Sequence, residues 1–281
     1  MPVPGGSCRL IAISCAALWL SCAAAARADV TAELIDKAMA GDWRSDANRA
    51  RDQYRHPKET LLFFGLQPDM TVVEITPAMG WYTEILAAVL RDNGKFYAAG
   101  FAVSSGKLGE AFVDLDRKFR QKLAARPDIY DRVTVTEIMA PEYVDIAPRR
   151  TVDLVVTFRN VHNWAKRGNA YSQFKAFHDA LKPGGILGVV DHRAAPGTPF
   201  QTQIDTGYMT EAYVIEVAEM AGFQFEAKSE VNANASDTKD HPKGVWTLPP
   251  TLALGDTDKA KYLAVGESDR MTLKFRKKGG Y

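Results

Sequence analysis

The stretch from Thr71 to Leu90 changes from strand-like to helix-like patterning across one short turn, and this change constrains the fold strongly. The segment 72–75 is apolar except for Glu74 and rich in β-branched residues, which is typical of a strand buried on both faces of a parallel sheet. After Pro77 the apolar residues recur at helical spacing, at Ile85, Leu86, Val89 and Leu90. The sequence therefore predicts a strand, a tight turn and a helix, an arrangement that directs backbone N–H groups and a positive helix end beyond the strand.

The same alternation continues along the chain. Further strands are expected at Lys95–Ala99, Arg132–Ile138, Thr151–Phe158, Ile186–Val190, Phe223–Val231 and Met271–Phe275. Helices are expected at Lys107–Ala125, Tyr171–Leu181 and Thr206–Ala221. Strands that alternate with helices predict an α/β fold with a doubly wound, mostly parallel sheet between two helical layers.

The N-terminus has the features of an export signal. Arg9 precedes an apolar run at 10–20, and the segment 26–28 matches a small-x-small cleavage pattern, so residues 1–28 are interpreted as a signal peptide. The run is too short for a stable membrane span, so no transmembrane anchor is expected. An exported, periplasmic protein is predicted, with a lipoprotein anchored through Cys22 as the minor alternative.

Removal of this segment changes what the composition implies. All three cysteines lie within it, so a disulfide, a thiolate metal site and a cysteine nucleophile are not expected in the remaining chain. Without the first 28 of 281 residues, 253 remain, with 33 basic against 34 acidic side chains because only Arg9 and Arg27 are lost. This near-neutral balance argues against nucleic acid as a partner.

The remaining chain is expected to begin with a helical extension at 29–55, with helices at Ala32–Met39 and Asp46–Tyr54. Four arginines of this extension are interpreted as a solvated face: Arg44, Arg49, Arg51 and Arg55. The main domain would then span 56–281 and begin with a short helix at Glu59–Phe64. A long polar stretch at 232–269 is expected to be an insertion, either a lid or flexible surface.

The turn after the first strand resembles a known motif. Residues 74–80, Glu-Ile-Thr-Pro-Ala-Met-Gly, are similar to the first motif of class I S-adenosylmethionine-dependent methyltransferases, although that family usually has glycine at the positions of Thr76 and Ala78. The Leu-Lys-Pro-Gly-Gly turn at 181–185 is a second feature of this family. The segment 56–81 also resembles a group of predicted bacterial methyltransferases that carry export signals. The resemblance implies that the sheet ends in an antiparallel strand pair.

The resemblance also implies which residues would hold S-adenosyl-L-methionine. Glu74 would position the loop or the ligand ammonium, and Thr76, Ala78 and Gly80 would supply backbone contacts. For Trp81 and Tyr82, a cation–π contact with the sulfonium and packing in the core both remain open. The loop lacks the Gly-x-Gly-x-x-Gly pattern of dinucleotide-binding folds.

One family feature is missing. Class I methyltransferases usually end the second strand with an acidic residue that binds the ribose, whereas this chain continues with Gly-Phe-Ala-Val-Ser-Ser at 100–105. Ser104, Ser105 or Glu110 could bind the ribose instead.

Polar residues follow two later strands. Arg159, Asn160, His162 and Trp164 follow the fourth strand, and Asp191-His192-Arg193 follow the fifth. Because ligands bind outside the carboxyl ends of parallel strands, these segments should meet the 74–80 turn. His162 is the first candidate general base and His192 the second, with Asp191, Arg159 and Asn160 orienting the acceptor or the base. The alternative is structural, with His162 capping a helix and Trp164 in the core.

These features give three functional hypotheses. The first is a methyltransferase that transfers the methyl group of S-adenosyl-L-methionine to an unknown small-molecule substrate, with the oligomeric state left open. The second is an exported, non-catalytic binding protein on a degenerate methyltransferase scaffold, because the acidic residue and two glycines are missing. The third is metal-dependent hydrolysis through His162, Asp191 and His192, which are metal-ligand residue types without a ligand spacing.

Overall fold

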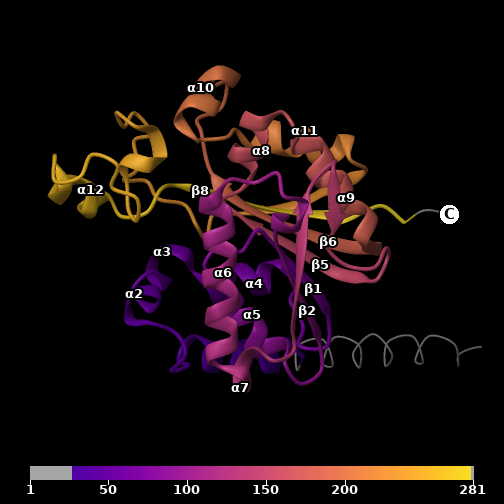
Figure 1. Cartoon of the computed structure of the whole chain (residues 1–281). Helices are drawn as coiled ribbons and strands as arrows, with labels where there is room; N and C mark the ends of the chain where they lie inside the picture. The colour runs from indigo at the N-terminus through magenta and orange to yellow at the C-terminus, as the bar shows by residue number, and fades with distance from the viewer. Residues whose placement is uncertain (1–26, 280–281) are drawn as a thin grey trace, which may run out of the picture.

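The computed structural model describes residues 27–279, and its centre is an eight-stranded sheet (Figure 1). The strand order is β4-β3-β2-β1-β5-β6-β8-β7. The strands are β1 Thr71–Ile75, β2 Lys95–Phe101, β3 Val133–Met139, β4 Tyr143–Asp145, β5 Val152–Phe158, β6 Leu181–His192, β7 Phe223–Ser229 and β8 Arg270–Lys277. β3, β2, β1, β5 and β6 pair in parallel, whereas β8 is antiparallel to both β6 and β7. The predicted mostly parallel sheet with an antiparallel strand pair at its end is confirmed.

Helices cover both faces of the sheet. One face carries α4 (Pro57–Phe64), α5 (Thr83–Leu90) and α6 (Glu110–Ala125). The other face carries α8 (Val161–Arg167), α9 (Ala170–Ala180) and α11 (Glu211–Met220). Apart from a helical segment at 27–39, the remaining α-helices are short: α2 Asp46–Arg49, α3 Asp52–Arg55, α7 Pro127–Tyr130, α10 Phe200–Thr206 and α12 Lys259–Val265.

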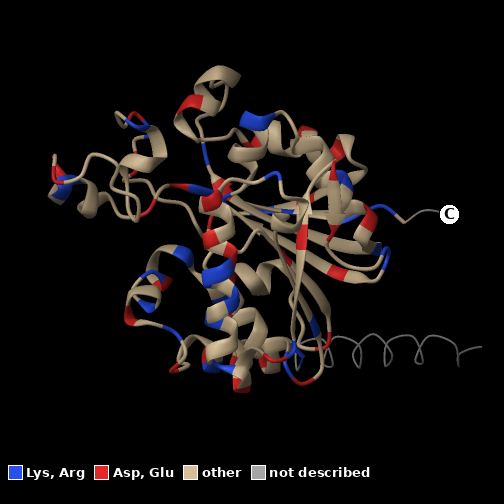
Figure 2. Ribbon diagram, in the orientation of Figure 1, with Lys and Arg blue, Asp and Glu red and all other residues tan. Residues whose placement is uncertain are grey.

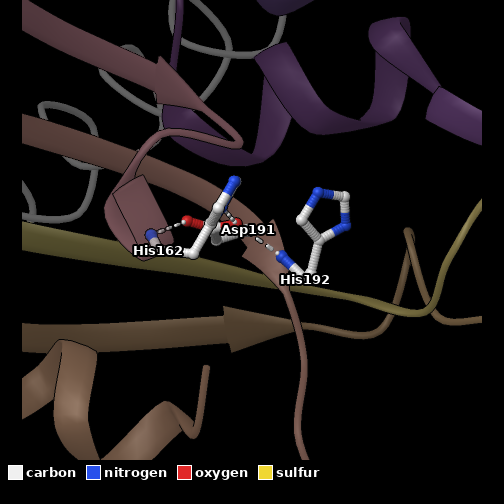
Figure 3. A group of neighbouring side chains, drawn as sticks. All are labelled: His162, Asp191 and His192. Atoms are coloured by element: carbon white, nitrogen blue, oxygen red, sulfur yellow. Dashed lines mark hydrogen bonds and ion pairs between the residues drawn. The ribbon is translucent and has the colours of Figure 1, made fainter. Parts of the chain in front are cut away.

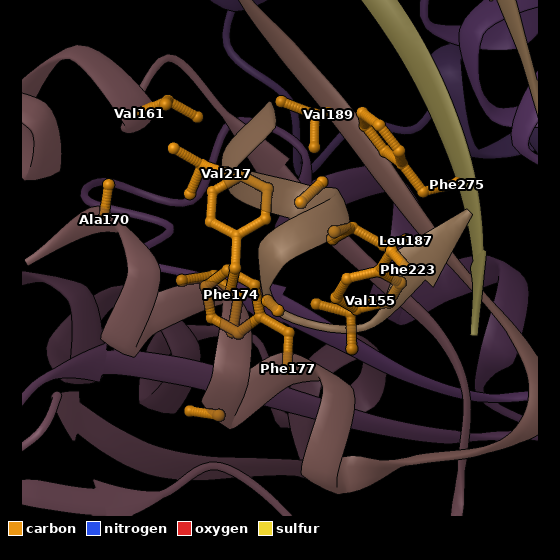
Figure 4. Packing of buried hydrophobic residues seen from close by; sticks show 14 of the residues in the cluster. Val155, Val161, Ala170, Phe174, Phe177, Leu187, Val189, Val217, Phe223 and Phe275 are labelled. Carbon is orange, nitrogen blue, oxygen red and sulfur yellow. The ribbon is translucent and has the colours of Figure 1, made fainter. Parts of the chain in front are cut away.

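The alternation of side chains along the strands builds two cores. Val72 and Leu154 belong to the cluster beneath α4, α5 and α6, whereas Val73 and Val155 belong to the cluster beneath α8, α9 and α11. Figure 4 shows part of the second cluster, in which phenylalanine rings from α9 lie beside aliphatic residues of the strands. Because successive strand residues point to opposite faces, both faces of the central strands are apolar and buried.

Several elements differ from those expected. The single helix predicted at Thr206–Ala221 is two helices, because Gly207 adopts a left-handed conformation at φ 76° and Thr210 caps α11 by accepting the N–H of Tyr213. The helix expected at Asp46–Tyr54 is likewise divided into α2 and α3. Residues 161–167, expected as loop, form α8. The short elements α7, α10 and β4 were not predicted.

The N-terminal region packs against the domain. Residues 27–39 are helical, and Ile35 and Ala38 are buried in the same cluster as Leu61 of α4. The expected solvated arginine face is wrong for Arg44 and Arg55, whose exposed fractions are 1% and 2%.

The expected signal peptide, with the three cysteines, lies almost entirely in residues 1–26, outside the described residues. Between residues 27 and 279, no helix is both long enough and apolar enough to cross a membrane. Figure 2 shows acidic and basic residues interspersed over the described fold, as the near-neutral composition indicates.

Candidate active site

A cavity of about 280 Å³ lies at the carboxyl ends of β1 and β5. Nine of the eleven residues predicted for the site line it: Glu74, Thr76, Ala78, Trp81, Tyr82, Arg159, Asn160, His162 and His192. Gly80 and Asp191 do not line it. Asp191 is fully buried behind His162, and Gly80 lies in the same turn as Ala78. The parallel strands therefore bring together segments that are far apart in the sequence.

The turn after β1 has the backbone conformation that glycine prefers. Thr76, Ala78 and Gly80 have φ values of 45°, 53° and 72°, so all three are left-handed. A Cβ atom at Gly80 would lie 2.7 Å from Cε2 of Phe119 on α6. The turn thus keeps a glycine-like shape at two positions where this chain has side chains, at a cost of about 1–2 kcal/mol each.

Glu74 is buried beneath this turn. Its Oε2 accepts a hydrogen bond of 2.6 Å from the Thr83 hydroxyl. Burial raises the pKa of Glu74 to about 7, although Thr83 and Lys122 act in the opposite direction. Lys122 also donates to the carbonyl oxygen of Met79 at 2.8 Å and so anchors the turn to α6.

Trp81 and Tyr82 are packed within the protein. The Trp81 ring lies beneath the guanidinium groups of Arg55 and Arg44, at 4.5 and 5.1 Å, and its Nε1 donates to the carbonyl of Asn48. The Tyr82 ring stacks on Phe158 with a centroid distance of 3.5 Å. Two arginines of the chain itself therefore already make cation–π contacts with the Trp81 ring. This favours packing in the core over contact with a ligand sulfonium for this residue.

His162 and Asp191 form a hydrogen-bonded pair at the first turn of α8 (Figure 3). Nδ1 of His162 lies 2.9 Å from Oδ1 of Asp191, whose two oxygens also accept the backbone N–H groups of His162 and His192 at 3.1 and 2.7 Å. Asp191 is an acceptor when ionised, so it favours the His162 tautomer with the proton on Nδ1. Nε2 of His162 is then free to accept a proton.

His192 is in a different environment. Its Nδ1 lies 2.5 Å from the hydroxyl oxygen of Ser268, and its ring centroid is 5.1 Å from that of His162. Burial, followed by the nearby His162 and Arg159, lowers the pKa of His192 well below the ordinary value. His192 is therefore neutral at physiological pH.

Asn160 and Arg159 have separate roles in the geometry. The Asn160 amide donates to the carbonyl of Ile75 and to the hydroxyl of Thr157, both at 3.1 Å, and so holds the ends of β1 and β5 together. Arg159 is left-handed at φ 62° and lines the cavity without an ion pair to any described residue. Burial lowers its pKa to about 10, and the neighbouring Arg270 adds to this effect.

The end of β2 has no carboxylate that lines the cavity. Phe101 lines it there instead. Ser104 donates its hydroxyl and its backbone N–H to Glu137 on β3, and the Ser105 hydroxyl donates to the carbonyl of Ala102. Neither serine lines the cavity, and neither does Glu110.

Two parts of the cavity wall come from segments that were not expected to reach the site. Arg55 comes from the N-terminal extension, and Val245, Trp246, Pro249, Pro250 and Thr251 come from the insertion at 232–269. The Trp246 ring lies 6.1 Å from that of His162, so this segment covers the site. In the sequence, the feature that could have indicated this part of the wall is Trp246 close to Pro249 and Pro250 in an otherwise polar stretch.

The three metal-ligand residue types do converge. Donor atoms of His162, Asp191 and His192 lie within 4.8 Å of one another. The Asp191 oxygens already accept three hydrogen bonds, however, and Arg159 and Arg270 lower the pKa of His192 from nearby. Because these positive charges repel a divalent cation, the site is better suited to proton transfer than to metal binding.

Comparison with known proteins supports the fold. No protein-family model matches the sequence, and no curated protein matches it. An S-adenosylmethionine-dependent methyltransferase from Aquifex aeolicus is 19% identical, with 81% of this chain and 93% of that chain covered and a TM-score of 0.52. The cyclase SpnF is 17% identical, with 85% of each chain covered and a TM-score of 0.54. The sheet topology and these neighbours show a fold of the class I methyltransferase type.

Proposed function

We propose that this protein is an S-adenosylmethionine-dependent methyltransferase that acts on a small-molecule acceptor. The observation that carries the proposal is the convergence of the His162–Asp191 pair and the left-handed 76–80 turn on one cavity, at the carboxyl edge of the sheet. Since one of the similar structures is a cyclase, the fold by itself does not decide the reaction, and the site must support it.

The residues around the turn fit the amino-acid end of the donor. The amides of Ala78 and Met79 make no hydrogen bond to another described residue, so they can donate to a carboxylate. Glu74 lines the cavity and can accept a hydrogen bond from an ammonium group. When bound, S-adenosyl-L-methionine supplies an electrophilic methyl group on its sulfonium.

His162 is the proposed general base. The acceptor would give up its proton to Nε2 of His162, and Asp191 would stabilise the resulting imidazolium through Nδ1. Asn160 joins the end of β5, from which the chain enters α8 and His162, to the end of β1. His192 is neutral and hydrogen-bonded to Ser268, so we assign it to the cavity wall beside the base.

Calorimetric titration of the purified protein with S-adenosyl-L-methionine and S-adenosylhomocysteine tests the proposal. We expect micromolar dissociation constants for both. Millimolar or undetectable binding of both compounds would contradict the proposal, whatever acceptor is tried.

A second candidate is a binding protein on the same scaffold. No acidic side chain from the end of β2 lines the cavity, and its volume lies just below the roughly 300–1,000 Å³ typical of small-molecule pockets. This candidate predicts that a small ligand binds while the methyl donor does not. The same titration therefore separates the two.

We also propose the domain division and location that the sequence suggested: an export signal at 1–28, a helical extension at 29–55 and the main domain at 56–281. The intact mass of the protein recovered from the periplasm of a bacterial expression host tests the first boundary. A mass that starts at Asp29 is expected, whereas a mass that includes residue 1 would contradict it.

A further inference from the structure

Four arginines from distant parts of the chain gather beside the cavity. Arg51 and Arg55 come from the N-terminal extension, Arg159 follows β5, and Arg270 begins β8. Arg55 and Arg270 have exposed fractions of only 2% and 3%. Arg55 and Arg159 line the cavity together with His162.

One carboxylate, that of Glu267, forms ion pairs with this cluster. Glu267 lies 2.5 Å from Arg51, 3.2 Å from Arg55 and 3.0 Å from Arg270, and no other described carboxylate lies within ion-pair distance of any of the four arginines. Although burial acts to raise it, the pKa of Glu267 is lowered to about 2 by Arg55 and Arg270, so Glu267 is ionised. Four positive charges therefore face one ion-paired carboxylate, with Asp191 as a further negative charge that acts on Arg159.

Several guanidinium nitrogens in the cluster have no partner. Nη2 of Arg51, Nη2 of Arg55 and Nε of Arg159 are buried without a hydrogen bond to any described residue. A buried donor that stays unpaired costs roughly 1–3 kcal/mol, and more when it is charged. The cluster is thus both unneutralised and incompletely hydrogen-bonded in the absence of a ligand.

Other buried or partly buried arginines of this protein are neutralised, which makes the cluster unusual within the same chain. Arg44 forms two 2.8 Å hydrogen bonds to Asp52 and a third bond to Glu84. Arg193 pairs with three carboxylates, those of Glu211, Glu230 and Asp269. The excess of positive charge is therefore local to the cavity.

The strand register places this charge next to the proposed base. Arg270 on β8 is paired with His192 on β6, and Asp191 immediately precedes His192 in the chain. Arg55 and Arg159 lie on the cavity wall with His162. A ligand group held by these arginines would leave the rest of the ligand beside His162.

We propose that the cavity binds a small molecule through a carboxylate or phosphate group, held by Arg55 and Arg159 with Arg51 and Arg270 behind them. Guanidinium groups bind such anions through paired, charge-assisted hydrogen bonds, which would satisfy the unpaired nitrogens of Arg55 and Arg159 and offset the positive charge of the cluster. We assign this anionic molecule as the methyl acceptor, and in this respect the inference rests on the proposed function.

The test uses inorganic phosphate and malonate as probes, with sodium chloride at matched ionic strength as the control. We expect both probes to raise the Tm of the wild-type protein above that in chloride. Arg159→Gln should weaken probe binding at least tenfold, whereas Arg149→Gln, which removes an equal charge from an exposed side chain, should leave it unchanged.

The stability of the unliganded variants provides an independent readout. Because Arg159 makes no ion pair and is close to other arginines, Arg159→Gln should raise the Tm of the free protein while it abolishes the shift caused by the probes. Arg159→Lys keeps the charge but loses the planar fork, and it should weaken the probes at least threefold. Equal stabilisation by chloride and the probes, or undiminished probe binding by both Arg159 variants, would overturn the proposal.

Titration with S-adenosylhomocysteine separates this inference from the proposed function. If the anion belongs to the acceptor, the probes and S-adenosylhomocysteine should bind together without competition. Competition would show that the arginines hold the donor's carboxylate and would overturn the acceptor assignment. Probe binding without any S-adenosylhomocysteine binding would refute the methyltransferase and retain the anion site.

Discussion

Nδ1 of His162 lies 2.9 Å from Oδ1 of Asp191, while Oδ2 of the same carboxylate accepts the backbone N–H of His162 at 3.1 Å. The two bonds fix both the position and the tautomer of the imidazole. The carboxylate comes from β6, whereas His162 lies in the first turn of α8.

Asp191→Asn should lower turnover by about 10²–10⁴-fold, because the amide can donate to Nδ1 and favour the wrong tautomer. Donor affinity, measured by calorimetry, should change less than threefold. Asp237→Asn is the matched control, since Asp237 pairs with His241 at 2.9 Å and neither residue lines the cavity. Equal loss of turnover in the two variants, measured where both are folded, would refute the proposed role of Asp191.

Glu74→Gln should change how stability depends on pH. Burial raises the folded-state pKa of Glu74 to about 7, above its ordinary value, so the native state binds the extra proton. Its stabilising contribution is complete below the unfolded pKa and is lost as the pH rises toward 7. Relative to the variant, the wild type should lose up to about 3 kcal/mol between pH 4.5 and 8. Urea unfolding at several pH values measures this difference, and a constant difference would contradict the prediction.

Gly80→Ala should destabilise the protein by about 2 kcal/mol or more, because it places a Cβ in the left-handed region and 2.7 Å from the ring of Phe119. Ala78→Gly is the control in the same turn. It removes strain from an exposed left-handed residue but increases the freedom of the unfolded chain, so the net change should stay within about 1 kcal/mol. Thermal unfolding of both variants tests the prediction, which fails if their Tm values agree.

Trp246→Ala should weaken the binding of small ligands about tenfold while the protein remains folded. The indole lies over His162 as part of the cavity wall, so its removal opens the site to water. Leu263→Ala is the control, because this residue is half exposed on the same insertion and does not line the cavity. Affinity for S-adenosylhomocysteine and for the acceptor should be measured separately. Unchanged affinity for both S-adenosylhomocysteine and the acceptor would contradict the prediction, because it would show that Trp246 does not contribute to ligand binding.

Much of the fold could be predicted from local patterns. The β-branched run before Pro77 and the helical spacing after it correspond to β1 and α5, and the Leu-Lys-Pro-Gly-Gly turn lies at the start of β6. The division between α10 and α11 was missed because it depends on a left-handed Gly207 and a Thr210 cap within a sequence of continuous helical character. Helix α8 was missed because its first turn is polar and aromatic.

The candidate site was only partly predictable. Strand ends in a parallel sheet share one edge, so the convergence of Glu74, Asn160 and His162 followed from the strand order. The position of the arginines at the cavity could not be predicted from the strand order. Arg55 lies in a charged segment that resembles a solvated helix, and only its packing against Trp81 and Glu267 reveals that it is buried.

The sequence by itself determined the alternation of elements, the layered sheet and the edge at which polar residues collect, because these depend on the periodicity of nearby side chains. Tertiary structure alone decided that Asp191 holds His162, that the insertion covers the cavity, and that three arginines share Glu267. Those outcomes depend on distances between residues up to about two hundred positions apart, and hydrogen bonding and charge act through space and not along the chain.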